Sequence, residues 1–114
     1  MEILRLLDQI SWVENYEVED YRHWGDGFYY RLKIQLQNQS VLFVREYVDE
    51  IERNYAFHWQ DENDKMIMRW DNAPHHSNLF TFPHHKHTPE GVAENMAVTL
   101  PDVLEEIGKY LKLD

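Results

Sequence analysis

The chain contains no cysteine, so it can form neither disulfide bonds nor cysteine-ligated zinc sites, and it has no thiolate nucleophile. It has only four glycines, and none of them has the spacing of a phosphate-binding loop. No apolar run approaches the roughly 18 residues that a membrane-spanning helix needs. Glu2 and Asp8 interrupt the apolar N-terminal stretch, which is not typical of a signal peptide. We therefore expect a cytoplasmic protein that has no contact with a membrane.

Positive charge is also scarce, because 11 lysines and arginines stand against 21 acidic residues and the formal net charge is -10. General nucleic-acid binders use a basic surface to neutralise phosphates, so this balance argues against broad nucleic-acid binding. The segment from Lys65 to Pro89 differs, since it has three basic residues, one acid and five histidines. It is a local positive patch of the kind that an anion-binding site requires.

A chain of 114 residues is expected to form one domain, 1–114, with a single core that needs no disulfide or metal. Apolar residues recur at helical spacing over 2–10 and predict a short N-terminal helix. A second apolar stripe at helical spacing follows Thr99, which is a good N-cap residue. It predicts a C-terminal helix.

Between the two helices, stretches of alternating and aromatic residues predict about five strands. These lie within 12–24, 30–37, 41–48, 55–60 and 66–71. If Asn63-Asp64 is a two-residue turn, antiparallel pairing sets His58 opposite Arg69 and Ala56 opposite Asp71. These four residues then share one face, and the other face is aromatic core. Tyr55, Trp59 and Trp70 belong to this aromatic face.

Residues 72–98 have no clear period and contain three prolines, which predicts a long, histidine-rich loop. The expected fold class is therefore α+β. It combines a mostly antiparallel sheet of about five strands, a short N-terminal helix, a C-terminal helix and the long His-rich loop.

Six of the seven histidines lie between His58 and His87, and imidazole is the side chain best suited to proton transfer near neutral pH. Together with arginine, histidines can cleave RNA without a metal ion, because they supply a base, an acid and a cation for phosphate. In this hypothesis Arg69 binds phosphate, two histidines exchange protons and Asp71 orients one of them. The candidate catalytic residues are His58, Arg69, Asp71, His75, His76, His84, His85 and His87. The candidate substrate-binding residues are Lys86, Glu46 and Asn72, and an exposed Tyr55, Trp59 or Trp70 would stack a base.

Two other functions remain open. His85 and His87 project to the same side of an extended segment, and with His75 or His76 they would offer three ligands to zinc or another divalent metal. Asp71 would act as a further ligand or accept a hydrogen bond from one of the imidazoles. This spacing matches no standard zinc pattern. The chain would then be a metal-dependent hydrolase. Alternatively, the His-rich loop is structural and belongs to a non-catalytic protein-binding module, with Arg69 and Asp71 as a plain ion pair. We expect no cofactor in the leading hypothesis, and exposed aromatics on an edge strand would permit a homodimer.

The run RWDNAPHH at 69–76, followed by TFPHHKH at 81–87, resembles the central signature of the TumE-like toxin family. The segments 46–49 and 55–60 are similar as well, so that the resemblance covers most of the chain beyond its first 25 residues. It implies a toxin that is encoded beside an antitoxin, and a DNA-binding antitoxin as its partner. It implies no particular chemistry, so the ribonuclease hypothesis depends on the side chains.

Overall fold

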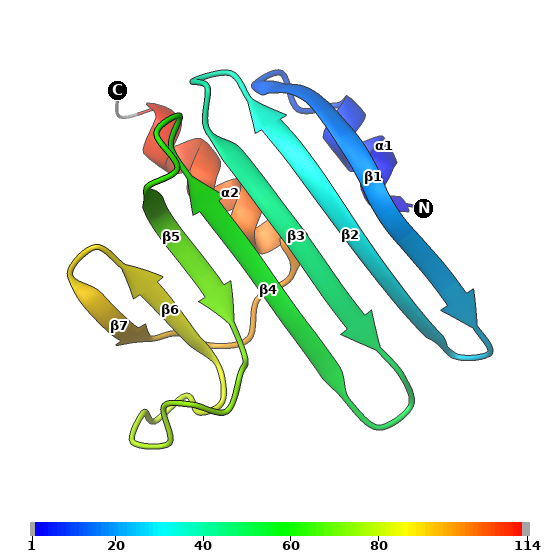
Figure 1. Cartoon of the computed structure of the whole chain (residues 1–114), viewed down its shortest axis with the longest axis vertical. Coiled ribbons are helices and arrows are strands. Elements are labelled where there is room, and N and C mark those ends of the chain that lie inside the picture. The colour runs from blue at the N-terminus through cyan, green and yellow to red at the C-terminus, as the bar shows by residue number, and fades with distance from the viewer. Residues whose placement is uncertain (1, 113–114) are drawn as a thin grey trace.

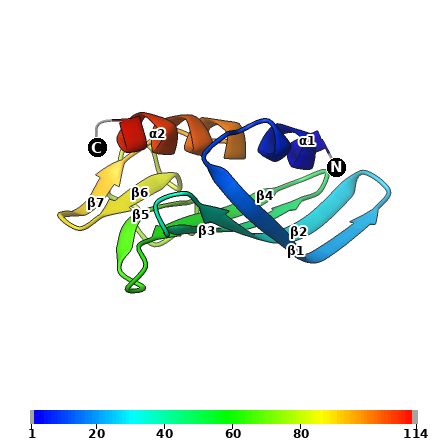
Figure 2. The same cartoon turned by 90° about the horizontal axis from the view of Figure 1, so that it is seen from above.

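A seven-stranded antiparallel sheet with its strands in chain order forms the body of the structure, a computed structural model that describes residues 2–112 (Figure 1). Both helices lie on the same face of the sheet, and the opposite face is left open (Figure 2). No helix within these residues is long and apolar enough to span a membrane. The elements are α1 (Glu2–Asp8), β1 (Val13–Trp24), β2 (Gly27–Leu36), β3 (Val41–Val48), β4 (Arg53–Gln60), β5 (Met66–Asp71), β6 (His85–Thr88), β7 (Gly91–Glu94) and α2 (Leu100–Lys112).

The covered face carries the core, as the alternation in the sequence predicts. Leu32 and Ile34 of β2 and Trp59 of β4 are fully buried, and they belong to the same cluster as Leu104 and Ile107 of α2. Burying a large apolar side chain stabilises the fold by about 1.5–3 kcal/mol. The other aromatic residues of β4 and β5 on this face, Tyr55, Phe57 and Trp70, are at most 3% exposed. None of the aromatic residues considered as base platforms can therefore stack on RNA.

Glu46 lies on this covered face and has the partners that a largely buried carboxylate needs. It accepts a hydrogen bond from the hydroxyl of Tyr30 at 2.7 Å and pairs with Nε of Arg53 at 2.6 Å. Burial, and then the charge of Glu46, raise the pKa of Tyr30, which therefore stays protonated. Nη2 of Arg53 donates to the carbonyl oxygen of Val98 at 2.7 Å, so this network ties the segment before α2 to the sheet.

The hairpin turn between β4 and β5 differs from the prediction. Asp61 N donates to the carbonyl oxygen of Lys65 at 2.8 Å, so the loop has three residues, 62–64, instead of two. Its last residue, Asp64, has a positive φ of 63°, as in three-residue hairpin loops that end in a bulge. A register shift next to Trp59 compensates for the longer loop. The predicted pairing of His58 with Arg69, and of Ala56 with Asp71, is therefore confirmed.

The histidine-rich segment contains two strands, β6 and β7, where the sequence predicted only a loop. The sheet consequently has seven strands instead of about five. The hairpin between them turns at Pro89-Glu90, with Thr88 opposite Gly91, whose φ of +130° suits glycine. Each strand is only four residues long, which is too short for a clear alternation, and β6 is made of residues that are common in loops.

The predicted N-cap of α2 is confirmed. The backbone N–H of Thr99 donates to Oδ2 of Asp102 at 2.9 Å, and Asp102 N donates back to Oγ1 of Thr99 at 3.3 Å. This reciprocal pair satisfies two backbone donors at the helix start. The apolar stripe behind it, which includes Val103 and Ile107, is buried against the sheet.

Candidate functional site

The face of the sheet that the helices leave uncovered, here called the open face, carries a positive charge that the composition of the whole chain hides. Alternate residues of β2 to β5 point toward it. Four of these residues are cations, Arg31, Lys33, Arg45 and Arg69, and only one is an acid, Asp71. On a protein with a net charge of -10, this is a strong local concentration of positive charge.

Strand register aligns the side chains of the open face in two rows that run from β2 to β6, and on β1 Asp20 is opposite Arg31 and Glu17 is opposite Lys33. Row one consists of Arg31, Arg45, Ala56, Asp71 and His85. Row two consists of Lys33, Phe43, His58, Arg69 and His87. Residues that are directly opposite each other on neighbouring strands have Cβ atoms about 5 Å apart, so neighbours in a row can act on the same bound group.

Asp71 is the centre of the polar contacts in this site, and it is only 4% exposed. Its carboxylate accepts from Nε of Arg69 at 3.0 Å and from the backbone N–H of Ala73 at 3.0 Å. It also faces Nε2 of His85 at 2.9 Å and Nε2 of His87 at 3.5 Å. A single buried carboxylate therefore contacts two strands and holds the side chains of Arg69, His85 and His87.

His85 is 2% exposed, and both of its ring nitrogens face oxygen acceptors. Nδ1 lies 2.9 Å from the carbonyl oxygen of Pro83, and Nε2 lies 2.9 Å from Oδ1 of Asp71. A neutral imidazole has one N–H, which can be donated to one of these two oxygens at a time. His85 is therefore suited to anchoring Asp71, and its burial keeps it from reaching a substrate.

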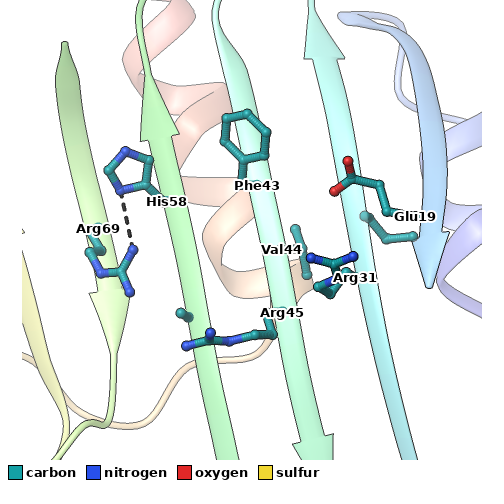
Figure 3. Close-up of a pocket in the computed structure, with 9 residues that line it drawn as sticks. Glu19, Arg31, Phe43, Val44, Arg45, His58 and Arg69 are labelled. Atoms are coloured by element: carbon teal, nitrogen blue, oxygen red, sulfur yellow. Dashed lines mark hydrogen bonds between the residues drawn. The ribbon is translucent and has the colours of Figure 1, made fainter. Parts of the chain in front are cut away.

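His58 and His87 stand on either side of Arg69 in row two. Nη1 of Arg69 lies 3.4 Å from Nδ1 of His58 (Figure 3). Because a guanidinium group only donates, Nδ1 accepts and the ring proton of His58 is on Nε2. Burial, and then the charge of Arg69, lower the pKa of His58. Burial also lowers the pKa of His87, and the opposing effect of Asp71 is smaller. Both imidazoles are thus largely neutral at pH 7.

Three imidazoles come together at the β6 end of the two rows, those of His76, His85 and His87. The nitrogen atoms with which these three residues could bind a metal ion lie within 4.8 Å of one another. Of the two histidines considered as the third ligand, His76 belongs to this group, whereas His75 is exposed and is not part of it. Since both nitrogens of His85 already face oxygen acceptors, a metal ion could bind His85 only by displacing one of these contacts.

The other predicted site residues lie away from the open-face cluster. The ring of His84 stacks on that of Tyr55, and its Nδ1 lies 2.8 Å from the Tyr55 hydroxyl, on the covered side. Nζ of Lys86 pairs with Glu106 of α2 at 3.2 Å. The side-chain amide of Asn72 bonds the backbone of β4, since Oδ1 accepts from Tyr55 N and Nδ2 donates to the carbonyl oxygen of Arg53. Glu46, as described above, lies on the covered face.

Sequence analysis missed three open-face residues, Arg31, Phe43 and Arg45. They line a shallow hollow of about 190 Å³ together with Ala56, His58 and Arg69 (Figure 3). Arg31 lies in the stretch 30–37, where apolar residues alternate with polar ones, so the sequence does assign it to a polar face. The sequence alone could not show that Arg31 lies on the same hollow as Arg69, because this requires the registers of the intervening strands.

Comparison with known proteins identifies the family. No curated protein and no solved structure matches the chain. A family model described as Toxin TumE matches residues 3–111, which is nearly the whole chain and includes every residue of the site. The chain therefore belongs to the TumE family of toxins, the toxin components of toxin–antitoxin systems.

Proposed function

We propose that this toxin is an endoribonuclease that needs no metal ion, with Arg69 as the phosphate-binding cation and His58 and His87 as the residues that exchange protons. The observation that carries the proposal is the order His58, Arg69, His87 in row two, on three adjacent strands. A phosphate held by Arg69 would have an imidazole on each side, at Cβ distances of about 5 Å from the arginine. The family membership makes an antitoxin the partner of this toxin.

The reaction is a transfer of the phosphoryl group within the RNA. One histidine removes the proton of a 2′-hydroxyl, whose oxygen attacks the adjacent phosphorus and forms a 2′,3′-cyclic phosphate. The bond from phosphorus to the 5′-oxygen of the next nucleotide breaks, and the other histidine, in its protonated form, supplies the proton that this oxygen needs. Arg69 neutralises the charge that accumulates on the phosphoryl oxygens. The role of Asp71 is to position Arg69, with which it makes a 3.0 Å hydrogen bond.

Cleavage of RNA by the purified chain, with and without EDTA, tests this proposal directly. We expect cleavage that survives EDTA and is lost in Arg69→Ala, while the variant keeps the far-UV circular dichroism of the wild type. Products that end in a 2′,3′-cyclic phosphate would identify the chemistry. If the wild-type chain cleaves no RNA under any condition, the proposal is wrong and a non-catalytic binding function takes its place.

The pH dependence of cleavage follows from the lowered pKa values of both histidines. The base must be neutral and the acid must be protonated, so kcat/KM is highest between the two pKa values of the pair. Since the pKa of His58 and that of His87 both lie below the ordinary value of 6.5, activity should fall as the pH rises above about 6.5. A plateau from pH 7 to pH 9 would contradict the assignment of these two residues.

A metal-dependent hydrolase is the second candidate, and the proximity of His76, His85 and His87 is the observation that favours it. In that case EDTA abolishes cleavage and added zinc restores it. Elemental analysis of protein purified without a histidine tag should then find about one equivalent of metal. Less than about a tenth of an equivalent, with no rescue by zinc, would rule this candidate out.

A further inference from the structure

Arg31 and Arg45 are paired directly opposite each other on β2 and β3, and both are exposed on the open face. Like charges at directly opposite positions destabilise a sheet. Among the ion pairs formed within residues 2–112, none includes either arginine. The register also places Asp20 of β1 opposite Arg31, but Asp20 pairs with Arg22, and Arg45 has cations or Ala56 as its row neighbours. The Arg45 side chain extends over β4, away from Arg31 (Figure 3). A bound anion would supply the counter-charge that Arg45 lacks.

The surroundings of the two arginines suit a phosphate. Ala56 is the neighbour of Arg45 in row one, and it lines the hollow with a small side chain that leaves room for a bound group. Arg69 lines the hollow at its β5 end. Because Arg69 is also the proposed phosphate-binding residue, the hollow is continuous with the proposed cleavage site. The carboxylate of Glu19 lies at the opposite rim, on β1 (Figure 3). A polyanion is thus attracted over β2 to β5 and is discouraged from extending across β1.

Phe43 supplies an apolar surface in the same place. It lies in row two between Lys33 and His58, it is only partly buried, and Nζ of Lys33 is 6.0 Å from the centre of its ring. An aromatic ring beside a row of cations is the arrangement with which sheet surfaces bind single-stranded nucleic acid, because an unpaired base can stack while its phosphates are neutralised. A base in a duplex is already stacked and cannot do so.

We propose that a single-stranded RNA lies across β2 to β5 on the open face, with its phosphates on Arg31, Arg45 and Arg69 and a base on Phe43. The proposal rests on the ribonuclease function for the orientation of the strand, whose scissile phosphate is the one at Arg69. Strands are spaced about 4.8 Å apart, so the track from β2 to β5 is roughly 14 Å long and holds a few nucleotides.

Binding and cleavage are measured separately, so that the proposed RNA track and the proposed ribonuclease function are tested independently of each other. The probe is a fluorescent single-stranded oligonucleotide with 2′-O-methyl groups, which cannot be cleaved through the 2′-hydroxyl. Its affinity is followed by anisotropy over a series of salt concentrations. Arg31→Gln and Arg45→Gln are each expected to reduce the slope of log affinity against log salt by about 0.7, the effect of losing one phosphate contact. Arg5→Gln, which removes the same charge from α1 on the covered side, should leave the slope unchanged.

Phe43→Leu keeps an apolar side chain but removes the ring, and it should weaken binding of the single strand by about 5- to 150-fold. The matching duplex should bind more weakly than the single strand. Because the arginine pair is repulsive, Arg45→Gln should also raise the melting temperature of the free protein. A lower melting temperature would show a structural role for this arginine and count against the proposal.

Absence of binding by the wild-type chain, or unchanged slopes in both arginine variants, overturns the proposed track. A glutamate-rich peptide that binds as tightly as the oligonucleotide, with no effect of Phe43→Leu, also overturns it and assigns the face to an acidic protein. Tight binding that the variants lose, without any cleavage of ordinary RNA, supports the track and refutes the ribonuclease. Cleavage with an unaltered KM in Arg31→Gln and Arg45→Gln refutes the track and leaves the ribonuclease in place.

Discussion

Replacing either His58 or His87 by glutamine is expected to lower kcat for RNA cleavage by about 10²- to 10⁴-fold, because each variant removes one of the two groups that transfer protons. KM should change little, since Arg69 remains in place to bind phosphate. Single-turnover kinetics on a short RNA would measure this effect. Each variant should also lose one limb of the pH profile, which a merely structural histidine would not do.

The double variant of His58 and His87 should be scarcely slower than the worse single variant, because residues that act as a unit are strongly non-additive. His23→Gln is the matched control, since His23 is exposed on β1 and is paired with Phe28, away from row two. Full activity in His58→Gln or in His87→Gln would exclude that residue from the reaction. In that case His76, the remaining imidazole beside row two, is the next candidate.

Asp71→Ala is expected to lower the free energy of unfolding by about 3–5 kcal/mol, the range for removing one partner of a buried ion pair. Most of this loss comes from His85, which would keep a buried ring nitrogen without an acceptor. The contribution of Arg69 is smaller, because 34% of its side chain is exposed and water screens the pair. Equilibrium urea unfolding, followed by tryptophan fluorescence, would measure the difference.

Asp71→Asn is the matched control, because the amide keeps the size of the side chain and one acceptor oxygen. It should lose less stability than Asp71→Ala, and it should still reduce cleavage, since Arg69 is no longer held by a charged partner. A loss below about 1 kcal/mol in Asp71→Ala would mean that β5 and β6 are held together without this carboxylate.

Much of the fold could be predicted from the sequence, because its long strands alternate clearly. The apolar row that contains Leu32 and Ile34 identified the core, and Thr99 marked the start of the last helix. The two short strands β6 and β7 could not be predicted in the same way. His85 and His87 form a strand because their backbone pairs with β5, and this pairing of distant segments leaves no periodic signal in four residues.

The site was predictable only where a short hairpin determines the register. The pairing of His58 with Arg69 was predicted from a two-residue turn, and it holds because the register shift next to Trp59 compensates for the three-residue loop. The burial of His85 and the placement of Lys86 on the opposite face depend on how the 72–84 segment returns to the sheet. The alignment of Arg31 with Arg45 required the β2–β3 register, which alternation alone does not provide.

The distribution of charge on this toxin has a consequence for how a polyanion approaches it. Acidic residues lie on β1, on the loops and on α2, whereas the open face is basic. The molecule therefore has a negative net charge and, in addition, an electric dipole whose positive end is the open face. At distances beyond the Debye length of about 8 Å at physiological ionic strength, an RNA chain experiences only weak net repulsion. At shorter range it is attracted from one direction alone. If RNA is the ligand, as proposed, we expect little non-specific sliding along nucleic acids and binding through the open face alone.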